Sequence, residues 1–311
     1  METVIEVKNL RKEFSELVAV DNLSFTVPRG KVYGFLGQNG AGKSTTIRML
    51  VTLVRPTEGE IRIFGLDLAK HRKEILRQTG AIIERPDLYK YLTALENLKI
   101  FAGMSGSSTE RKVLMDQLEM VGLADRAHSK VKTYSQGMKQ RLGIATALVH
   151  DPALIILDEP TNGLDPQGIA DIRNLILHLS RDKGKTLVVS SHLLSEMELV
   201  SDSMLIIDKG RKLVEGKVTD LFDPAETLVE LRTADDAVFL SRLQGSLLNT
   251  SLHKTANGSI QLKMHRNDLN NIMGRLLELQ VPILSFSARH SLEDYFLNLT
   301  SGPQHVEAFK N

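Results

Sequence analysis

At 311 residues the chain is long enough to bury a sizeable core and to form two domains, one of them large. Its 39 basic and 38 acidic residues nearly cancel, so composition gives no basic field of the kind expected of a protein whose main partner is nucleic acid. Cysteine is absent, which excludes disulfides, thiolate nucleophiles and cysteine metal sites. The N-terminal segment lacks a signal-peptide core, and no apolar run approaches the roughly 18 residues of a spanning helix. We therefore expect a cytoplasmic protein that another chain would hold at any membrane.

The chain is expected to open with two strands, over residues 3–10 and 23–27, separated by a turn. Phe14 falls between them. It could lie flat against a purine ring, or it could be a half-buried aromatic of a strand, and the local pattern fits both.

A strand, a glycine-rich turn and a helix follow in direct succession. Residues 32–36 are a short apolar run suited to a buried strand, residues 37–42 contain three glycines, and residues 43–50 have the spacing of an amphipathic helix. The pattern G-x-x-x-x-G-K-[ST] falls across this turn, which predicts a phosphate-binding loop.

Each residue type in that loop has a chemical role in binding a triphosphate. Gly37, Gly40 and Gly42 carry no Cβ, so backbone N–H groups can turn toward phosphate oxygens, and the helix N-terminus adds free donors. Lys43 supplies a positive charge for the β- and γ-phosphates, and the Ser44 hydroxyl is a ligand for Mg²⁺. ATP and Mg²⁺ are therefore the expected cofactors.

The next elements continue the alternation of strand and helix. We expect a strand over residues 60–65, a helix near residues 71–79 and a short buried strand over residues 81–83 that ends at Glu84.

From residue 93 onward helices dominate. Thr93 and Glu96 are spaced as a capping box, which predicts a helix to about residue 101, and residues 107–110 repeat the spacing before a helix that ends at Gly122. Ser135 is expected to cap a third helix that runs to about residue 150. Residues 85–150 therefore form a predicted helical insert.

Alternation then resumes. Residues 153–157 predict a buried strand, Asp165 followed by proline is a strong helix start, and residues 186–189 predict another strand. A helix and a hairpin close the domain near Gly216. Parallel strands joined by helices indicate an α/β nucleotide-binding domain, here a P-loop NTPase with a helical insert.

Two carboxylates follow the strand of residues 153–157. Side chains of successive strand residues point to opposite faces, but the backbone can bend at a strand end, so Asp158 and Glu159 can reach one site. One carboxylate there can hold the Mg²⁺ shell, and the other can accept a proton from an attacking water.

With these motifs in order, the sequence resembles the ATP-binding subunit of ABC transporters over residues 1–220. Residues 37–45 match the Walker A motif, residues 154–158 the Walker B motif and residues 134–138 the signature, which other P-loop ATPases lack. Residues 81–98 further resemble a subset of these ATP-binding subunits, those of bacterial exporters of the bacitracin-resistance and lantibiotic-immunity type.

The resemblance implies a role for each matching residue. The catalytic residues would be Glu159 as the general base, His192 as the switch histidine, and Lys43. Nucleotide contacts fall to Phe14, Gly37, Asn39, Gly40, Ala41, Gly42, Lys43, Ser44, Thr45, Ser135, Gly137 and Asp165. Metal contacts fall to Ser44, Glu84 and Asp158.

Three positions depart from the common family pattern. The signature has Gln136 in place of a glycine and Met138 in place of a glutamine, while the serine and second glycine remain. Glu84 stands where the family has a glutamine. Its extra negative charge would be held ionised by the metal or partly protonated, and either outcome would alter turnover.

The resemblance also implies partners. A second ATPase subunit, either another copy of this chain in a homodimer or a related subunit, would present its own Ser135 and Gly137 to the γ-phosphate, and ATP-driven closure would power an integral membrane permease. The subunit would then lie on the cytoplasmic face of the membrane, held there by the permease. The candidates for the permease-facing surface are Pro86, Leu88, Tyr89 and Tyr91, with simple loop packing as the other interpretation.

The last ninety residues predict a separate accessory domain over residues 225–300 with a tail at 301–311. Strands and helices are expected in the order βαββαβ, which suggests a ferredoxin-like α+β fold. The strands fall at 226–232, 247–253, 259–264 and 282–287, the helices at 235–243, 267–279 and 291–300, and a hairpin turn at 257–258. We expect a dimer-stabilising or regulatory role for this domain.

Two other functions compete with a transporter ATPase. A soluble ABC-type ATPase acting on ribosomes or DNA would be favoured by tandem cassettes or a basic arm, and the sequence has neither. A regulatory subunit with weak hydrolysis is kept open by Glu84 and the altered signature, whereas Glu159 and His192 argue against it.

Overall fold

A computed structural model describes residues 2–221 without a break and, beyond them, residues 227–234, 238–239, 252–254, 260–264, 268–269, 272, 274, 276 and 283–290. The chain divides into two compact units, Met1–Val218 and Thr219–Asn311, each described here by itself.

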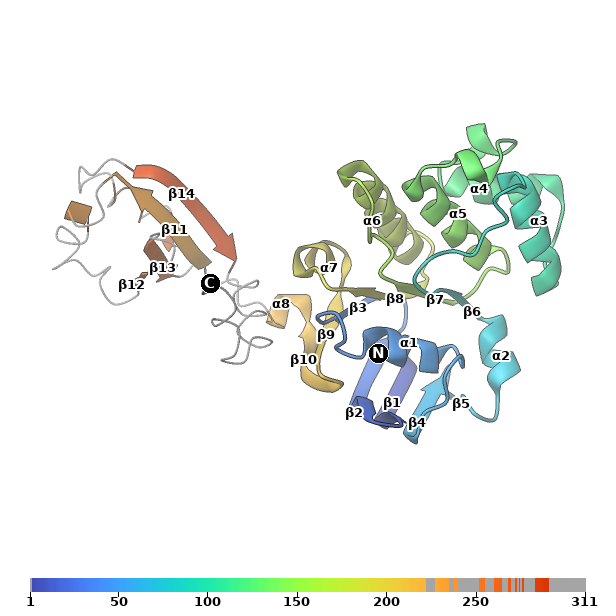
Figure 1. Ribbon diagram of the computed structural model, residues 1–311, viewed down its shortest axis with the longest axis horizontal. Helices are drawn as coiled ribbons and strands as arrows, with labels where there is room; N and C mark the ends of the chain where they lie inside the picture. The colour runs from blue at the N-terminus through green and yellow to red at the C-terminus, as the bar shows by residue number, and fades with distance from the viewer. Residues whose placement is uncertain are drawn as a thin grey trace. The chain divides into compact units, whose positions relative to one another are not determined.

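A six-stranded sheet forms the centre of the first unit (Figure 1). Its order is β10 (Arg211–Lys217), β9 (Ser203–Asp208), β3 (Val32–Leu36), β8 (Thr186–Ser191), β7 (Leu154–Asp158) and β6 (Thr79–Ile82). Neighbouring strands pair in parallel except β9 and β10, which form a hairpin. Every residue of β3, β7 and β8 is buried, as expected for strands covered on both faces.

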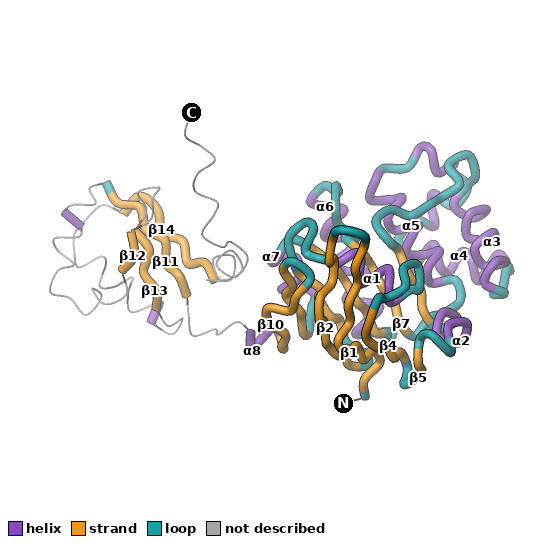
Figure 2. Tube along the Cα trace, turned by 60° about the horizontal axis from the view of Figure 1, so that its bottom comes forward, coloured by secondary structure: helices purple, strands orange, loops and turns teal. Residues whose placement is uncertain are grey.

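A second, antiparallel sheet has the order β2 (Leu17–Pro28), β1 (Thr3–Phe14), β4 (Glu58–Ile63) and β5 (Leu66–Asp67). The two strands predicted at residues 3–10 and 23–27 are confirmed, but both extend further toward the turn than expected. The strands continue to a tight turn at residues 15–16, because cross-strand pairs such as Phe14 with Leu17 hold residues that show no clear apolar alternation. Figure 2 shows β1, β2 and β4 side by side, with β10 next to β2.

Helices fill the connections between the parallel strands. α1 (Lys43–Leu50) follows β3 and packs Ile47 and Met49 into one apolar core shared by both sheets. The others are α2 (Arg72–Arg77), α6 (Pro166–Arg181) and α7 (Leu194–Val200). A short helix, α8 (Val218–Leu221), follows β10. The predicted start of α6 is confirmed: Asp165 accepts from the Gly168 N–H at 3.0 Å, and proline takes the first helical turn.

The helical insert contains α3 (Ala94–Ser105), α4 (Arg111–Met120) and α5 (Gln136–Leu148), which lie together at one side of the unit (Figure 1). Two short 3₁₀ helices, Ala124–Arg126 and Val131–Thr133, connect α4 to α5. The capping box at Thr93 is confirmed, with both reciprocal hydrogen bonds present.

The capping box predicted at residues 107–110 was wrong. Glu110, expected at the third helical position, is itself the N-cap residue of α4, so the helix starts three residues later than the box requires. The Ser108 hydroxyl instead accepts from the Glu110 N–H at 3.3 Å, a local turn that competes with capping.

The second unit contains a four-stranded antiparallel sheet in the order β12 (Leu252–Lys254), β13 (Ile260–Met264), β11 (Thr227–Thr233) and β14 (Ile283–His290). Numbered along the chain this order is 2-3-1-4, as in a ferredoxin-like fold. Helical residues at 238–239 and at 269, 272, 274 and 276 fall where the two crossover helices are expected, and Phe239, Ile272 and Leu276 pack on the sheet residues. The hairpin turn at 257–258, the helix at 291–300 and the tail predicted from the sequence lie outside the described residues.

Within the part of the chain that the structure describes, no helix combines the length and the apolar character that crossing a bilayer requires.

Candidate functional site

The glycine-rich turn between β3 and α1 has the backbone that its sequence predicts. Gly40 and Gly42 have φ values of 84° and 103°, in the region that other residues adopt only with strain. At Gly42 a Cβ atom would also lie 2.6 Å from the Ala19 carbonyl oxygen of β2. Glycine is therefore required at this position by both the dihedral angle and the close approach of a neighbouring strand.

Lys43 is the first residue of α1, and its side chain folds back into the loop, only 5% exposed. The ammonium donates to the Gly37 carbonyl oxygen at 2.6 Å and to that of Gln38 at 3.3 Å. It also lies 3.2 Å from Glu159 Oε1. The loop thus encloses a positive charge that three oxygens hold in place.

The carboxylates that follow β7 are organised by one hydroxyl group on the neighbouring strand. Asp158 is fully buried, and its Oδ1 accepts a 2.6 Å hydrogen bond from Ser190 Oγ on β8. The same Ser190 oxygen accepts from the Glu159 N–H at 2.9 Å. Glu159 has a positive φ of 50°, which turns its side chain to the same side as that of Asp158.

Glu159 links the phosphate loop to the end of β8. One carboxylate oxygen faces Lys43, and the other accepts a 2.8 Å hydrogen bond from Nδ1 of His192. The Glu159 carboxylate therefore lies between Lys43 and His192, with one oxygen directed at each side chain.

These groups open onto a pocket of about 440 Å³. Its lining combines the start of α1, the ends of β6 and β7, and the first turns of α5: Ser44, Ile83, Glu84, Arg85, Gln136, Gln140, Asp158, Glu159, Asn162 and Gly163. Charged and polar side chains from the core and from the insert thus meet in one cavity.

Of the residues expected to contact nucleotide, Ser44 alone lines this pocket, and Ser135, Gly137 and Asp165 belong to the signature and to the start of α6. Ser135 is an exposed N-cap whose hydroxyl accepts from the Met138 N–H at 3.2 Å, and Asp165 is an exposed N-cap of α6. Gly137 lies against Gly168 of α6, since a Cβ on Gly137 would be 3.7 Å from the Gly168 Cα. Within one chain the signature therefore adjoins the start of α6.

The residues of the pocket fit a magnesium ion. Oδ2 of Asp158 is buried and has no hydrogen-bond partner, which is a costly state for a carboxylate oxygen unless a cation contacts it. Ser44 lines the same pocket and supplies a hydroxyl. In the described part of the chain no cluster of three or more histidine, aspartate or glutamate side chains is spaced to hold a metal. Mg²⁺ suits this arrangement, because it is usually held by one or two carboxylates together with substrate phosphates and water.

Glu84 also lines the pocket, but its carboxylate is paired. Oε1 accepts a hydrogen bond from the Arg48 guanidinium of α1. The sequence suggested a metal contact or protonation as ways of accommodating this charge, and the structure shows a third way, an ion pair.

Phe14 ends β1 and is 43% exposed, with the Lys12 ammonium 4.7 Å from its ring centroid. Its hairpin touches the phosphate loop through Ala19, the residue whose carbonyl approaches Gly42. The ring is therefore an accessible aromatic surface carried by the strand pair that adjoins the loop.

Two residues of the site were not predicted. Ser190 was seen only as the end of a strand, and Arg48 only as part of an amphipathic helix. The run of serines before His192 was the available signal for Ser190, because hydroxyls are unusual at the end of a fully buried strand.

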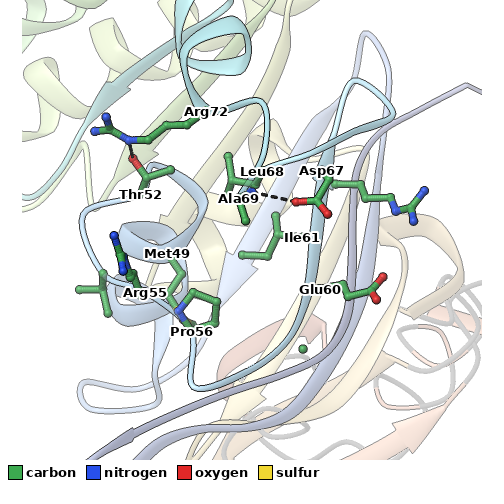
Figure 3. A pocket seen from close by; sticks show the side chains of 13 residues that line it. Met49, Thr52, Arg55, Pro56, Glu60, Ile61, Asp67, Leu68, Ala69 and Arg72 are labelled. Carbon is green, nitrogen blue, oxygen red and sulfur yellow. Dashed lines mark hydrogen bonds between the residues drawn. The ribbon is translucent and has the colours of Figure 1, made fainter.

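A larger pocket of about 800 Å³ lies elsewhere, between the end of α1, β4 and the start of α2 (Figure 3). Its floor includes Met49 and Ile61, and at its rim Arg72 donates to Thr52 Oγ1 at 2.7 Å. It contains none of the predicted site residues.

Comparison with known proteins identifies the family. A family model described as ABC transporter matches residues 20–162. The chain is 42% identical over 305 residues to the uncharacterized ABC transporter ATP-binding protein YhcH of Bacillus subtilis (strain 168), covering 96% of this chain and 97% of the relative. The chain belongs to the ABC transporter ATP-binding family. Another family member, the bacitracin transport ATP-binding protein BcrA of Bacillus licheniformis, is 41% identical over 305 residues, covering 97% of this chain and 99% of BcrA.

Solved structures of the ABC family share the fold. The dimeric ATP-binding cassette MJ0796, in a post-hydrolysis state with ADP and Pi bound, superposes with a TM-score of 0.62 at 28% identity. The match covers 69% of this chain and 98% of the cassette. The predicted α/β P-loop fold is thereby confirmed.

Proposed function

We propose that this chain binds ATP with Mg²⁺ and hydrolyses it. The observation that carries the proposal is the unpartnered, buried Oδ2 of Asp158, in a pocket that it shares with Ser44 and Glu159. A buried carboxylate oxygen and a hydroxyl that line one pocket are a donor set for Mg²⁺, which would neutralise developing phosphate charge when bound. Membership of a family of ATP-binding proteins and the similarity to a post-hydrolysis cassette support the same reaction.

In this proposal the residues of the phosphate loop bind the polyphosphate. The backbone N–H groups of Gly40 and Gly42 and the N-terminus of α1 offer donors to phosphate oxygens, and Lys43 supplies charge. The Lys43 ammonium would exchange its contact with Glu159 for one with phosphate. That exchange frees a carboxylate oxygen of Glu159.

Glu159 is the proposed general base. Ser190 fixes its backbone, and His192 holds its second oxygen, so the carboxylate keeps its orientation when Lys43 leaves. A base within reach of the attacking water takes its proton as the bond to phosphorus forms. In the same proposal His192 contacts the γ-phosphate.

A second copy of the chain would complete the site. Ser135 and Gly137 do not line the pocket of their own chain, whereas Ser135 is exposed at a helix N-terminus and free to face a partner. We propose that two chains close around ATP and that Asp165, beside the signature, links the two sites. The dimeric form of MJ0796 supports this arrangement.

We propose that ATP binding and hydrolysis power export through a membrane permease. The permease holds the chain at the cytoplasmic face of the membrane. The transport name of BcrA supports an antibiotic as substrate, and a peptide or lipid-like compound fits the same subset. Of the predicted docking residues, Tyr89 and Tyr91 are exposed by 51% and 80% and remain candidates. Leu88 is only 8% exposed, so of its two interpretations loop packing fits and a docking surface does not.

The test is ATP hydrolysis by the purified chain, with Glu159→Gln as the diagnostic variant. Because general-base catalysis is worth about 10² to 10⁴ in rate, we expect the variant to lose at least about 100-fold in kcat. Glu119→Gln, an exposed carboxylate of α4, is the matched control and should retain the rate. Size-exclusion profiles should show the Glu159 variant as a dimer with ATP and as a monomer without it. Hydrolysis by Glu159→Gln at the wild-type rate would refute the assignment of the base.

A further inference from the structure

Glu84 occupies an unusual backbone position at the entrance to the insert. It follows β6 directly, and its φ of 61° lies in the left-handed region, where a non-glycine residue is strained. Its side chain is 63% exposed, and it lines the pocket of Ser44 and Asp158. A strained and solvent-accessible residue keeps one conformation only when a specific contact holds it.

That contact comes from the phosphate-binding helix. Arg48 lies one turn after Ser44 on α1, so the two side chains emerge from the same face of the helix. The guanidinium of Arg48 reaches across to Glu84 and donates to Oε1. One short helix therefore carries both a proposed ligand of the metal and the partner of the carboxylate next to it.

The charges of the pocket explain why such a partner is needed. Three carboxylates line a cavity proposed to receive a polyphosphate: Glu84, Asp158 and Glu159. Glu159 faces Lys43, and Asp158 has an oxygen suited to a metal. Without Arg48, the charge of Glu84 would act directly against the incoming phosphates.

We infer that Arg48 is a positioning residue that latches Glu84, offsetting its charge and fixing the junction between the phosphate-binding helix and the helical insert. This inference rests on the proposed function, since it names the role of two side chains at the same site. A glutamine at this position carries no charge and would need no partner. The ion pair with Arg48 makes Glu84 compatible with nucleotide binding at the same position. It also ties the orientation of the insert to the helix that receives the phosphates.

The test is a double-mutant cycle on the full chain. The four proteins are wild type, Arg48→Gln, Glu84→Gln and the double variant, and the probe is a fluorescent mant-ATP titrated in EDTA, so that neither metal nor hydrolysis contributes. Arg48→Lys checks rescue by a second cation. Arg55→Gln is the matched control, because Arg55 is an exposed arginine just beyond α1 that lines the larger pocket instead (Figure 3).

The latch predicts a specific pattern of affinities. In the wild-type background Arg48→Gln should weaken mant-ATP binding about fivefold, because an uncompensated carboxylate then faces the phosphates. In the Glu84→Gln background the same change should alter affinity by less than about twofold. Arg48→Lys and Arg55→Gln should both stay within about twofold of wild type. A loss of equal size in both backgrounds, or no loss in the wild-type background, would overturn the latch.

A second measurement separates this inference from the proposed function. Thermal unfolding of the nucleotide-free proteins reports the ion pair whether or not ATP binds. Each single change should lower the midpoint, and the double variant should fall no further than the more destabilised single variant. Additive shifts would overturn the latch. If wild type binds no mant-ATP even when Mg²⁺ is supplied, the proposed function fails, and this unfolding cycle alone decides whether Arg48 and Glu84 are coupled.

Discussion

Replacing Ser190 by alanine tests whether one hydroxyl organises both carboxylates. The change removes a 2.6 Å hydrogen bond to the buried Asp158, and hydrogen bonds to charged groups contribute about 1.5–3 kcal/mol. It also leaves the Glu159 N–H without its 2.9 Å acceptor. A buried donor without an acceptor costs about 1–3 kcal/mol, and we count part of that cost here because the site is only partly buried. We therefore expect a loss of about 3 kcal/mol in the free energy of unfolding. Because such supporting contacts hold metal-binding and catalytic groups, kcat should fall about 10- to 100-fold.

The matched control is the next residue of the same strand. Ser191 is equally buried, but its hydroxyl accepts only from the Leu193 N–H at 3.0 Å and touches neither carboxylate. Ser191→Ala should cost about 1 kcal/mol and leave kcat within about threefold. The assays are urea denaturation followed by circular dichroism and ATP turnover at saturating Mg²⁺. Equal loss of turnover in both variants, or a wild-type rate in Ser190→Ala, would refute the reasoning.

Three further changes test other parts of the molecule. Phe14→Ala should weaken ATP binding about tenfold in a mant-ATP titration, because stacking on a base is worth about 1–3 kcal/mol. Burial and the Glu215 carboxylate raise the pKa of Tyr33 well above its usual value, so the unfolded chain ionises first in alkali. The stability advantage of wild type over Tyr33→Phe in urea denaturation should be full below pH about 10 and disappear as the pH rises further. Gly143→Ala should lower the thermal midpoint, since its Cβ would lie 2.4 Å from the Cβ of Pro86, and overpacking at about 1–3 kcal/mol exceeds the helix-propensity gain of about 1 kcal/mol.

Each of these changes has a control or a contradicting outcome. Leu17→Ala alters the exposed residue paired with Phe14 and should leave ATP affinity unchanged. A difference between wild type and Tyr33→Phe that stays constant through alkaline pH would contradict the buried tyrosine. Gly103→Ala should raise the thermal midpoint, because no atom lies within 4 Å of a Cβ at this position of α3. A rise for Gly143→Ala as well would contradict the close contact with Pro86.

Local chemistry explains which features of the fold could be predicted. The glycines of the phosphate loop, the capping box at Thr93 and the proline-started helix after Asp165 each depend on neighbours within a few residues. The buried strands were visible because full burial requires an unbroken apolar run. The strand order of the second unit followed from the order of its elements along the chain.

The failures were of two kinds. Residues 107–110 contain the letters of a capping box, but the backbone of Glu110 starts the helix later, and sequence does not show which of two overlapping turns will form. Leu88 is buried although its neighbours along the chain are mostly exposed, and the local sequence does not show this difference. The first hairpin is longer than expected because its cross-strand pairs continue into residues without apolar alternation.

The candidate site was predicted in its residue types but not in its pairings. Lys43, Asp158, Glu159 and His192 were expected near one another, because each follows a strand at the same edge of a parallel sheet. That Glu84 pairs with Arg48 could not be predicted, since many arginines of the chain were equally available. Partner choice among like side chains is a property of the folded backbone.

The turn between β9 and β10 carries a consequence for how the protein is made. The Gly210 N–H donates to the Ala41 carbonyl oxygen at 2.9 Å, and its own carbonyl accepts from the Asp21 N–H at 2.9 Å. A Cβ on Gly210 would lie 2.7 Å from the Ala19 carbonyl oxygen. The phosphate loop near the N-terminus is thus fastened by a residue that the ribosome adds much later. A nascent chain that has not yet emerged past Gly210 lacks this fastening, so the ability to hold a nucleotide should arise late in synthesis and in a single step.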